Sequence, residues 1–469
     1  MSYYGTNPSF ANGRLPLFSN PLKRAREFQV FTDAGAPTPE RSPIDPTTGL
    51  PVNDGRAHGL RVFEGMDGEL PELDPLLWKA KYPWLSVRVV PGEACFVWAK
   101  AWPTFPELRI PNSSGRWHIP SMEAIAYTKP KFLRTLDWQR TNERPDWSKP
   151  RTSSSAPLQG GAMSAEIQRE AAMLLKCSLW FCAPPRFELS VAEYEARLEL
   201  LLLAIWDRNA KHPPVLEYGN ELWNSAFPVH GWLREESQAQ SFTSANVRSW
   251  HDAAAQEIAI LKRVADKVFG PSEPLGRKNY YLFVGGQLTV PSHLERILSA
   301  LRGLEIVPDM AGPALYVTPL KASVEEWEAT GAVPSQDELR LSCFARLEEI
   351  GIGAGSGAIG QAAGPLERHR RIVAEAGVPY FACYEAGQSL IAGNAPWRKA
   401  AIEAQGTEGM GDLYRGIRRV AEAARVDVLN WYSAATDQTP TDPRVDVFGL
   451  LGSADLSKAP PKARAARGE

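Results

Sequence analysis

The sequence predicts an α/β protein built on a (β/α)8 TIM barrel, and three observations support this fold class. Short apolar runs alternate with amphipathic helical patterns from about residue 131 onward, an order typical of βαβ units with parallel strands. Seven such runs follow residue 131 and an eighth opens the chain, which is the number that closes a barrel. The chain has 469 residues, 44% of them hydrophobic, so one barrel with insertions can absorb most of its length.

The expected strands are short apolar segments bordered by turn residues. The first opens the chain at Ser2–Asn7. The other seven are Phe132–Trp138, Cys177–Ala183, Val215–Glu221, Tyr280–Gly286, Ala311–Val317, Pro379–Glu385 and Val428–Ser433. Eight strands separated by helices fit a closed barrel better than an open sheet.

The helices expected between these strands carry apolar residues three to four positions apart. Ser164 and Ser190 stand directly before two of them, where an N-cap belongs. The predicted helices are Ala165–Lys176, Val191–Asn209, Asn246–Val268, Leu294–Leu304, Asp337–Ile350, Leu366–Ala376 and Gly411–Ala424.

Two segments depart from this alternation. Residues 54–122 are rich in Trp, Pro and Gly, with β-like pieces at Ser86–Val90 and Ala94–Trp98, and we interpret them as a β-rich insertion. Residues 458–469 read KAPPKARAARGE and are expected to form a flexible tail. The barrel, including its insertion, would then occupy residues 1–457.

Composition argues against several partners. Lys and Arg number 52 against 54 Asp and Glu, a net charge of −2, so neither nucleic acid nor an anionic membrane is an expected partner. No run approaches the roughly 18 apolar residues that span a bilayer, and the start of the chain shows no secretory signal. The seven histidines show no HxxxH or HxH spacing, so we expect no metal and no cofactor. The run Gly355–Gly360 satisfies GxGxxG but follows a helix, which disfavours nucleotide binding.

The strongest local motif is VLEYGNELWNSAF, residues 215–227. An apolar strand leads into Asn220 and Glu221, and catalytic groups of parallel barrels come from the C-terminal ends of strands. Glu221 is therefore a candidate catalytic acid. The alternative is a carboxylate that only interacts with a helix N-terminus.

A second carboxylate follows the seventh expected strand in YFACYEAG, residues 380–387. Alternation along a strand would place Phe381, Cys383 and Glu385 on one face. Glu385 could be a salt-bridged residue at the barrel mouth, or it could be catalytic. Strands four and seven face each other across a barrel, so Glu221 and Glu385 together suit a two-carboxylate hydrolysis.

These motifs resemble clan A glycoside hydrolases, retaining TIM-barrel enzymes that carry Asn-Glu after strand four and a nucleophilic Glu after strand seven. LRTLDWQRTN, EYGNELWN, DMAGPALYV and YEAG look like a bacterial and phage glycosidase-like or cellulose-binding-like group with an EYxNEvWN motif. The resemblance covers about Arg134–Tyr432 and Leu15–Val52. One departure is Pro185, which stands after strand three where the family usually places His.

The resemblance implies roles for individual residues. Glu221 would be the general acid/base and Glu385 the nucleophile. Asn220 would bind the sugar 2-hydroxyl, Tyr316 would orient Glu385, and Trp431 would form the floor beneath the sugar.

Arg134 would lie near Glu385 and keep it ionised, with a depressed pKa for Glu385 and a raised one for Glu221. The alternative is a buried ion pair of Arg134 with Glu217 or Asp137. Glu217 shares a strand face with Glu221 and is the main rival for its role. Tryptophans near strand ends are candidate sugar platforms, namely Trp138, Trp180, Trp223 and Trp431.

The expected function is a retaining glycoside hydrolase that cleaves a β-linked oligo- or polysaccharide. A transglycosylase with the same residues is a variant of this hypothesis. The rival class is an inactive glycan-binding or structural barrel, carried on a larger particle such as a phage tail. Without a visible signal peptide, the sequence leaves location open between the cytoplasm and such a particle.

Overall fold

The computed structural model describes part of the chain. The described residues are 3–7, 27–32, 62–63, 95–100, 125–139, 141–145, 147, 165–206, 212–239, 247–270, 278–351, 364–390, 395, 397–432, 449–451 and 459–469. They belong to two compact units, one of Met1–Arg14 with Tyr127–Glu469 and one of Leu15–Ala126.

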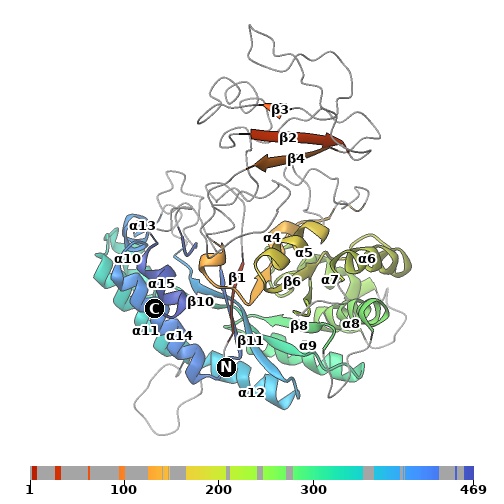
Figure 1. The fold of residues 1–469 in the computed structure, drawn as a ribbon. Coiled ribbons are helices and arrows are strands. Elements are labelled where there is room, and N and C mark those ends of the chain that lie inside the picture. The colour runs from red at the N-terminus through yellow and green to blue at the C-terminus, as the bar shows by residue number, and fades with distance from the viewer. Residues whose placement is uncertain are drawn as a thin grey trace. The chain divides into compact units, whose positions relative to one another are not determined.

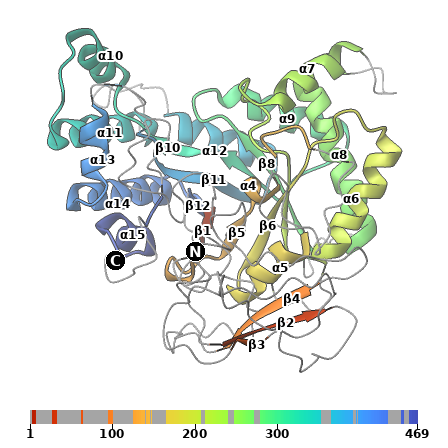
Figure 2. The same cartoon turned by 90° about the horizontal axis from the view of Figure 1, so that it is seen from above.

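The larger unit contains a closed barrel of parallel strands, as predicted (Figures 1 and 2). Its strands run in the order β10-β11-β12-β1-β5-β6-β7-β8-β9, and β11 also pairs with β9, which closes the ring. β9 and β10 are separated only by Ala314 and together occupy one of the eight positions. The strands are β1 Tyr3–Asn7, β5 Phe132–Arg134, β6 Ser178–Ala183, β7 Val215–Tyr218, β8 Tyr281–Gly286, β9 Met310–Pro313, β10 Leu315–Val317, β11 Tyr380–Gln388 and β12 Val428–Tyr432.

Helices alternate with these strands, which is the arrangement that parallel connections require. The helices are α4 Leu136–Gln139, α5 Ala165–Leu174, α6 Val191–Ile205, α7 Pro228–Ala239, α8 Trp250–Phe269, α9 Pro291–Gly303, α10 Lys321–Thr330, α11 Gln336–Gly351, α12 Pro365–Glu375, α13 Arg398–Ala404, α14 Glu408–Ala423 and α15 Pro461–Arg467. Ser190 caps α6 as predicted, in a reciprocal capping box with Glu193. Ser164 lies outside the described residues.

The barrel interior is filled by every second residue of its strands. One cluster of buried side chains combines contributions from most of the ring: Trp180, Cys182, Val215, Phe283, Met310, Ala382, Tyr384 and Val428. Rings from strands that are not neighbours meet here, Trp180 with Phe283 at 4.7 Å and Phe283 with Tyr384 at 5.7 Å between centroids, as expected of side chains inside the ring. The intervening residues point to the helices, as Tyr218 does where its hydroxyl donates to Glu257 of α8 at 3.0 Å.

Two expected strands end earlier than predicted. The second stops at Arg134, and Leu136–Gln139 turns into the short helix α4, so Trp138 does not lie on a strand. The fourth stops at Tyr218, because Gly219 takes a left-handed φ of 65°.

The smaller unit contains a three-stranded antiparallel sheet of order β3-β2-β4. Its strands are β2 Glu27–Thr32, β3 Val62–Phe63 and β4 Cys95–Lys100. The β-like piece expected at Ala94–Trp98 falls on β4, whereas Ser86–Val90 lies outside the described residues. The unit spans residues 15–126 and is larger than the insertion expected at 54–122.

The C-terminal segment differs from the expected flexible tail, because Pro461–Arg467 forms helix α15. Pro at the first position of a helix costs no hydrogen bond, so the Pro-rich stretch begins a helix here. Ala463, Ala465 and Ala466 are buried, and the buried Lys462 Nζ donates to Gln405 Oε1 at 2.6 Å. Gly411 of α14 leaves room for Pro461, since a Cβ at Gly411 would meet Pro461 Cβ at 2.8 Å.

Candidate active site

Arg134 is the central cation of the barrel mouth. Its Nε and Nη2 donate to Glu217 Oε2 and Oε1, each at 2.8 Å, in a bidentate pair. Its Nη1 donates to Glu385 Oε1 at 2.5 Å, and Nη2 also reaches Asn220 Oδ1 at 2.6 Å. The two alternatives drawn from the sequence, a pair with Glu385 and a pair with Glu217, therefore both occur. Nothing is described of the Asp137 side chain.

Glu385 enters the barrel through an irregularity in β11. The register between β11 and β12 shifts between Cys383 and Ala386, and such a bulge turns a residue to the other face. As a result the consecutive residues Tyr384 and Glu385 both contact Arg134, one through its ring and one through its carboxylate. The expected common face of Phe381, Cys383 and Glu385 is wrong, because Ala382 and Tyr384 are the residues that join the interior cluster.

Tyr316 holds the second oxygen of Glu385. It lies on β10, next to β11, and its hydroxyl donates to Glu385 Oε2 at 2.7 Å. This is the contact that the resemblance implied. Glu385 thus accepts one hydrogen bond from a guanidinium and one from a phenol, and only 5% of its surface is exposed.

Glu221 lies in the turn after β7, not at the end of the strand. Its backbone is left-handed, with φ of 43°, a conformation that costs free energy for any residue with a Cβ. Its Oε2 accepts from Asn224 Nδ2 at 2.8 Å and its Oε1 from the Tyr384 hydroxyl at 3.2 Å. The nearest following helix, α7, begins only at Pro228, so the helix N-terminus alternative does not apply.

Asn220 is anchored by its neighbours on both sides. Its Oδ1 accepts from Arg134, and its Nδ2 donates to Asn142 Oδ1 at 2.8 Å. An amide nitrogen carries two hydrogens, so one donor remains for a ligand hydroxyl.

Of the four candidate sugar platforms, Trp223 is the one that is partly exposed. It is half-buried, and its Nε1 donates to the Tyr384 hydroxyl at 3.3 Å, beside Glu221. Trp180 has no exposed surface and donates to Glu217 Oε2 at 2.8 Å inside the barrel. Trp138 is 2% exposed, so it offers no face to a ligand either.

Trp431 also departs from its expected role as the floor beneath the sugar. It is 1% exposed and packs on Tyr414 of α14, with ring centroids 5.2 Å apart. It therefore lies between the barrel and the helices. The inward residue at this end of β12 is its neighbour Tyr432, whose ring is 6.1 Å from that of Tyr316.

Three contributors were not assigned from the sequence: Tyr384, Asn224 and Asn142. Tyr384 directly precedes Glu385, and Asn224 lies three residues after Glu221, so their closeness in sequence to the two glutamates was the available signal. Asn142 lies in the LRTLDWQRTN motif, but only the fold brings it to Asn220.

The pKa values of Glu221 and Glu385 are both raised, whereas the sequence predicted a depressed pKa for Glu385. The pKa of Glu385 is raised to about 8, because burial and the neighbouring Glu221 and Glu217 raise it more than Arg134 and Tyr316 lower it. Burial also raises the pKa of Glu221, against the hydrogen bonds from Asn224 and Tyr384. The expected depressed pKa of Glu385 is wrong because the burial of its carboxylate outweighs the attraction of Arg134, which also pairs with Glu217. The carboxyls interact, so the proton that remains near neutral pH belongs to the pair.

Pro185, which stands where the resembling family usually has His, lies in a loop after β6 that is held in place by several contacts. Pro185 is buried, and its carbonyl accepts from Trp147 Nε1 at 3.3 Å. The next residue, Arg186, forms ion pairs with Glu257 at 2.9 Å and Glu236 at 3.2 Å. This loop is therefore tied to α7 and α8.

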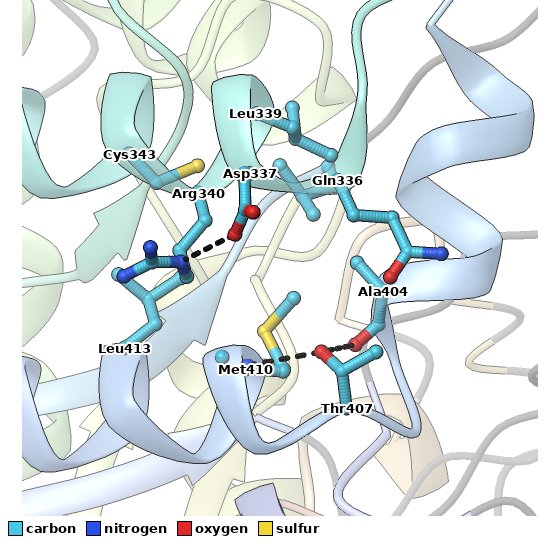
Figure 3. Close-up of a pocket in the computed structure, with 11 residues that line it drawn as sticks. Gln336, Asp337, Leu339, Arg340, Cys343, Ala404, Thr407, Met410 and Leu413 are labelled. Atoms are coloured by element: carbon cyan, nitrogen blue, oxygen red, sulfur yellow. Dashed lines mark hydrogen bonds and ion pairs between the residues drawn. The ribbon is translucent and has the colours of Figure 1, made fainter.

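A separate pocket lies among α11, α13 and α14, away from both glutamates (Figure 3). Its lining combines apolar side chains, such as Met410, with an ion pair between Arg340 and Asp337. It contains neither candidate carboxylate. Among the described residues, no group of three or more His, Cys, Asp or Glu side chains could hold a metal ion. The Gly355–Gly360 run lies outside the described residues.

No helix in the described part of the chain combines the length and apolarity needed to cross a membrane.

No family model and no curated protein matches the sequence. The fold is similar to solved structures of glycoside hydrolases, the class that the motifs resemble. A family 51 α-L-arabinofuranosidase from Bifidobacterium longum has a TM-score of 0.44 at 11% identity, covering 77% of this chain and 69% of the enzyme. The GH39 enzyme from Xanthomonas axonopodis pv. citri gives 0.43 at 11% identity, covering 78% and 64%.

A glucosidase from Croceicoccus marinus gives a TM-score of 0.40 at 12% identity, covering 74% of this chain. This chain spans 62% of that glucosidase and 31% of β-glucuronidase 2 from Bacteroides uniformis, less than two thirds of either length.

Proposed function

We propose that this chain is a retaining glycoside hydrolase, with Glu385 as nucleophile and Glu221 as general acid/base. The observation that carries the proposal is the pair of carboxyls at one barrel end, the buried Glu385 and the partly exposed Glu221, held by different partners and interacting electrostatically. Two carboxyls of this kind are the machinery of glycosidic bond cleavage. Neither a metal nor a cofactor is needed for that chemistry.

The partners of each carboxyl support the division of roles. Glu385 accepts from a guanidinium and a phenol, and both contacts stabilise its ionised form. Among the described residues, Glu221 accepts from the neutral groups of Asn224 and Tyr384, so the shared proton is better accommodated there. Glu221 is also more exposed than Glu385, which suits a group that must later activate water.

The reaction would proceed in two displacements. Glu221 donates its proton to the leaving oxygen while a Glu385 oxygen bonds to the anomeric carbon and the glycosidic C–O bond breaks. In the second step the Glu221 carboxylate takes a proton from water. The water oxygen bonds to the anomeric carbon, and the bond to Glu385 breaks. Both carboxyls return to their starting forms.

We propose a β-linked oligo- or polysaccharide as substrate, with Trp223 as the platform and the free N–H of Asn220 as a donor to a hydroxyl. An aromatic face beside an amide donor suits a sugar ring, which has an apolar face and polar edges. The β linkage is carried over from the resemblance to clan A hydrolases.

A panel of glycans assayed for new reducing ends tests this function. Glu221→Gln and Glu385→Gln should each lower the rate by at least about 10³-fold, since each removes a group that the transition state needs. Glu188→Gln is the control, because Glu188 is 70% exposed in its side chain, and it should leave the rate unchanged. NMR of the first product anomer should show retention of configuration.

A binding protein would give a different pattern. It would hold a glycan from the panel equally well in the wild type, Glu221→Gln and Glu385→Gln, and would release no reducing ends. That result would reject the proposed hydrolase. A loss of activity in Glu217→Gln alone, with Glu221→Gln active, would assign the acid to the deeper carboxyl.

A further inference from the structure

The side chain of Tyr384 contacts both Glu221, the proposed acid/base, and Arg134, which binds Glu385, the proposed nucleophile. Its hydroxyl is 3.2 Å from Glu221 Oε1 and accepts from Trp223 Nε1 at 3.3 Å. The guanidinium carbon of Arg134, which holds Glu385, lies 4.9 Å from the centre of its ring. Tyr384 therefore contacts the acid/base directly and the nucleophile through Arg134.

The ring of Tyr384 is confined on several sides. It has no exposed surface, and Phe283 lies 5.7 Å away between ring centroids. Gly285 leaves the space that the ring occupies, because a Cβ there would come within 3.3 Å of Tyr384 Cε1. The ring cannot swing away, so the hydroxyl oxygen stays beside Glu221.

The hydroxyl carries one proton and has two acceptors within reach. Glu221 Oε1 is at 3.2 Å and the carbonyl oxygen of Gly286 at 3.5 Å. When Glu221 is ionised, donation to the carboxylate is the stronger, charge-assisted bond. When Glu221 is protonated that advantage is lost, and the O–H can rotate to Gly286 without any movement of the ring.

We propose that Tyr384 is a positioning residue for the general acid/base, whose hydroxyl proton follows the protonation of Glu221 by switching between Oε1 and the Gly286 carbonyl. This inference rests on the proposed function for its role in catalysis. The contact with Glu221 itself does not depend on which substrate is cleaved. Tyr384 would fix Oε1, stabilise the carboxylate formed after proton donation, and release the carboxyl when it holds its proton again.

The first test is a titration of Glu221 in the full-length protein, which needs no substrate. Carboxyl carbons of ¹³C-labelled Glu are followed by NMR, with Glu221→Gln used to assign the signal. Tyr384→Phe should raise the Glu221 midpoint by about one pH unit, since it removes one hydrogen bond to the charged form. An unchanged midpoint in Tyr384→Phe overturns the proposal.

Two further phenols of the barrel serve as matched comparisons. Tyr380→Phe alters a residue on the same strand that is 39% exposed, and it should leave both glutamates unchanged. Tyr316→Phe removes the bond to Glu385 and should shift the Glu385 signal more than that of Glu221. Equal shifts of Glu221 in all three variants would indicate a general change of the barrel and reject a specific role for Tyr384.

Gly285→Ala supplies a second variant that keeps the hydroxyl. The added Cβ presses on the ring and moves the hydroxyl by a few tenths of an ångström. The Glu221 midpoint should move in the same direction as in Tyr384→Phe, by a smaller amount. If Tyr384→Phe does not fold, an unchanged midpoint in Gly285→Ala overturns the proposal by itself.

The second test is kinetic and uses aryl glycosides of the sugar identified in the glycan panel. With phenols that leave poorly, kcat/KM should fall about 10- to 100-fold in Tyr384→Phe, because these need proton donation by Glu221. With dinitrophenyl leaving groups, kcat/KM should stay within about threefold. Equal losses for both leaving groups would overturn the role in acid catalysis. If the wild type cleaves no glycoside, the proposed hydrolase fails while the titration still decides the contact.

Discussion

At the scale of single residues, Arg134 determines how the barrel mouth is organised. One fully buried guanidinium satisfies acceptors from β7, from the turn after it and from β11. Three carboxyls surround this cation in the described part of the mouth, namely Glu217, Glu221 and Glu385. Burial raises the pKa values of Glu221 and Glu385, which favours one proton retained by that pair, and general acid catalysis requires such a proton.

Arg134→Met should destabilise the protein by roughly 3–5 kcal/mol, since it leaves buried carboxylates without a cation. Urea unfolding at pH 7 measures the loss. Arg144→Met is the control: its ion pair with Glu188 is exposed, 57% and 70% of the two side chains, so it should cost less than about 1 kcal/mol. Equal losses in the two variants would contradict the central role of Arg134.

At the scale of elements, the described part of the barrel follows from the sequence because each strand is a short apolar run between amphipathic helices. The positions of Glu221 and Glu385 follow from the order of these runs along the chain. The finer orientation does not. Alternation with period two fails at the bulge in β11, and it predicted the wrong partners for Glu385 on its strand face.

The tryptophans show a second reason why the site could be predicted only in part. An indole beside a strand end is equally suited to a sugar platform and to the core. Trp223 lies in the turn that follows β7, whereas Trp180 points into the barrel interior and Trp431 faces a helix. Neither composition nor spacing distinguishes these environments, because the choice depends on where each strand ends and which face its side chains take.

The closure of the barrel depends on Gly312, where β9 meets β11. Gly312 has a φ of 158°, and a Cβ there would lie 2.0 Å from the Ala382 carbonyl oxygen. Gly312→Ala should therefore separate these strands and destabilise the protein by about 3 kcal/mol or more, as expected of strong overpacking. Thermal unfolding measures the effect. Gly303→Ala has open space around its Cβ and should change stability by less than about 1 kcal/mol; a similar loss in both variants would contradict this account.

At the scale of the whole molecule, stability should depend on pH through buried carboxyls. Burial raises the pKa of Glu257 to about 7, and it also raises the pKa values of Glu221 and Glu385, which as an interacting pair retain one shared proton. The folded chain keeps these protons after the unfolded chain has released them near pH 4.5. The stability linked to them is complete below pH 4.5 and is lost as the pH rises through 7 and 8.

The unfolding free energy should therefore fall progressively from about pH 4.5, still decrease by about 1–2 kcal/mol between pH 6.5 and 8.5, and level off at higher pH. This window avoids the buried histidines, since burial lowers the pKa of His251 and His369 to about 4. Urea unfolding across the window should give a shallower slope for Glu257→Gln than for the wild type. A flat wild-type profile, or equal slopes in the two proteins, would show that these carboxyls are ionised in the folded chain.

The division of labour between the two glutamates is tested most directly by trapping the covalent intermediate. Glu221→Ala is incubated with dinitrophenyl glycosides that form the intermediate without acid assistance, and peptides of the quenched protein are weighed by mass spectrometry. One added sugar residue on the peptide that contains Glu385 is the expected result. An adduct on Glu217, or no adduct with any sugar that the wild type hydrolyses, would contradict the assignment of Glu385 as nucleophile.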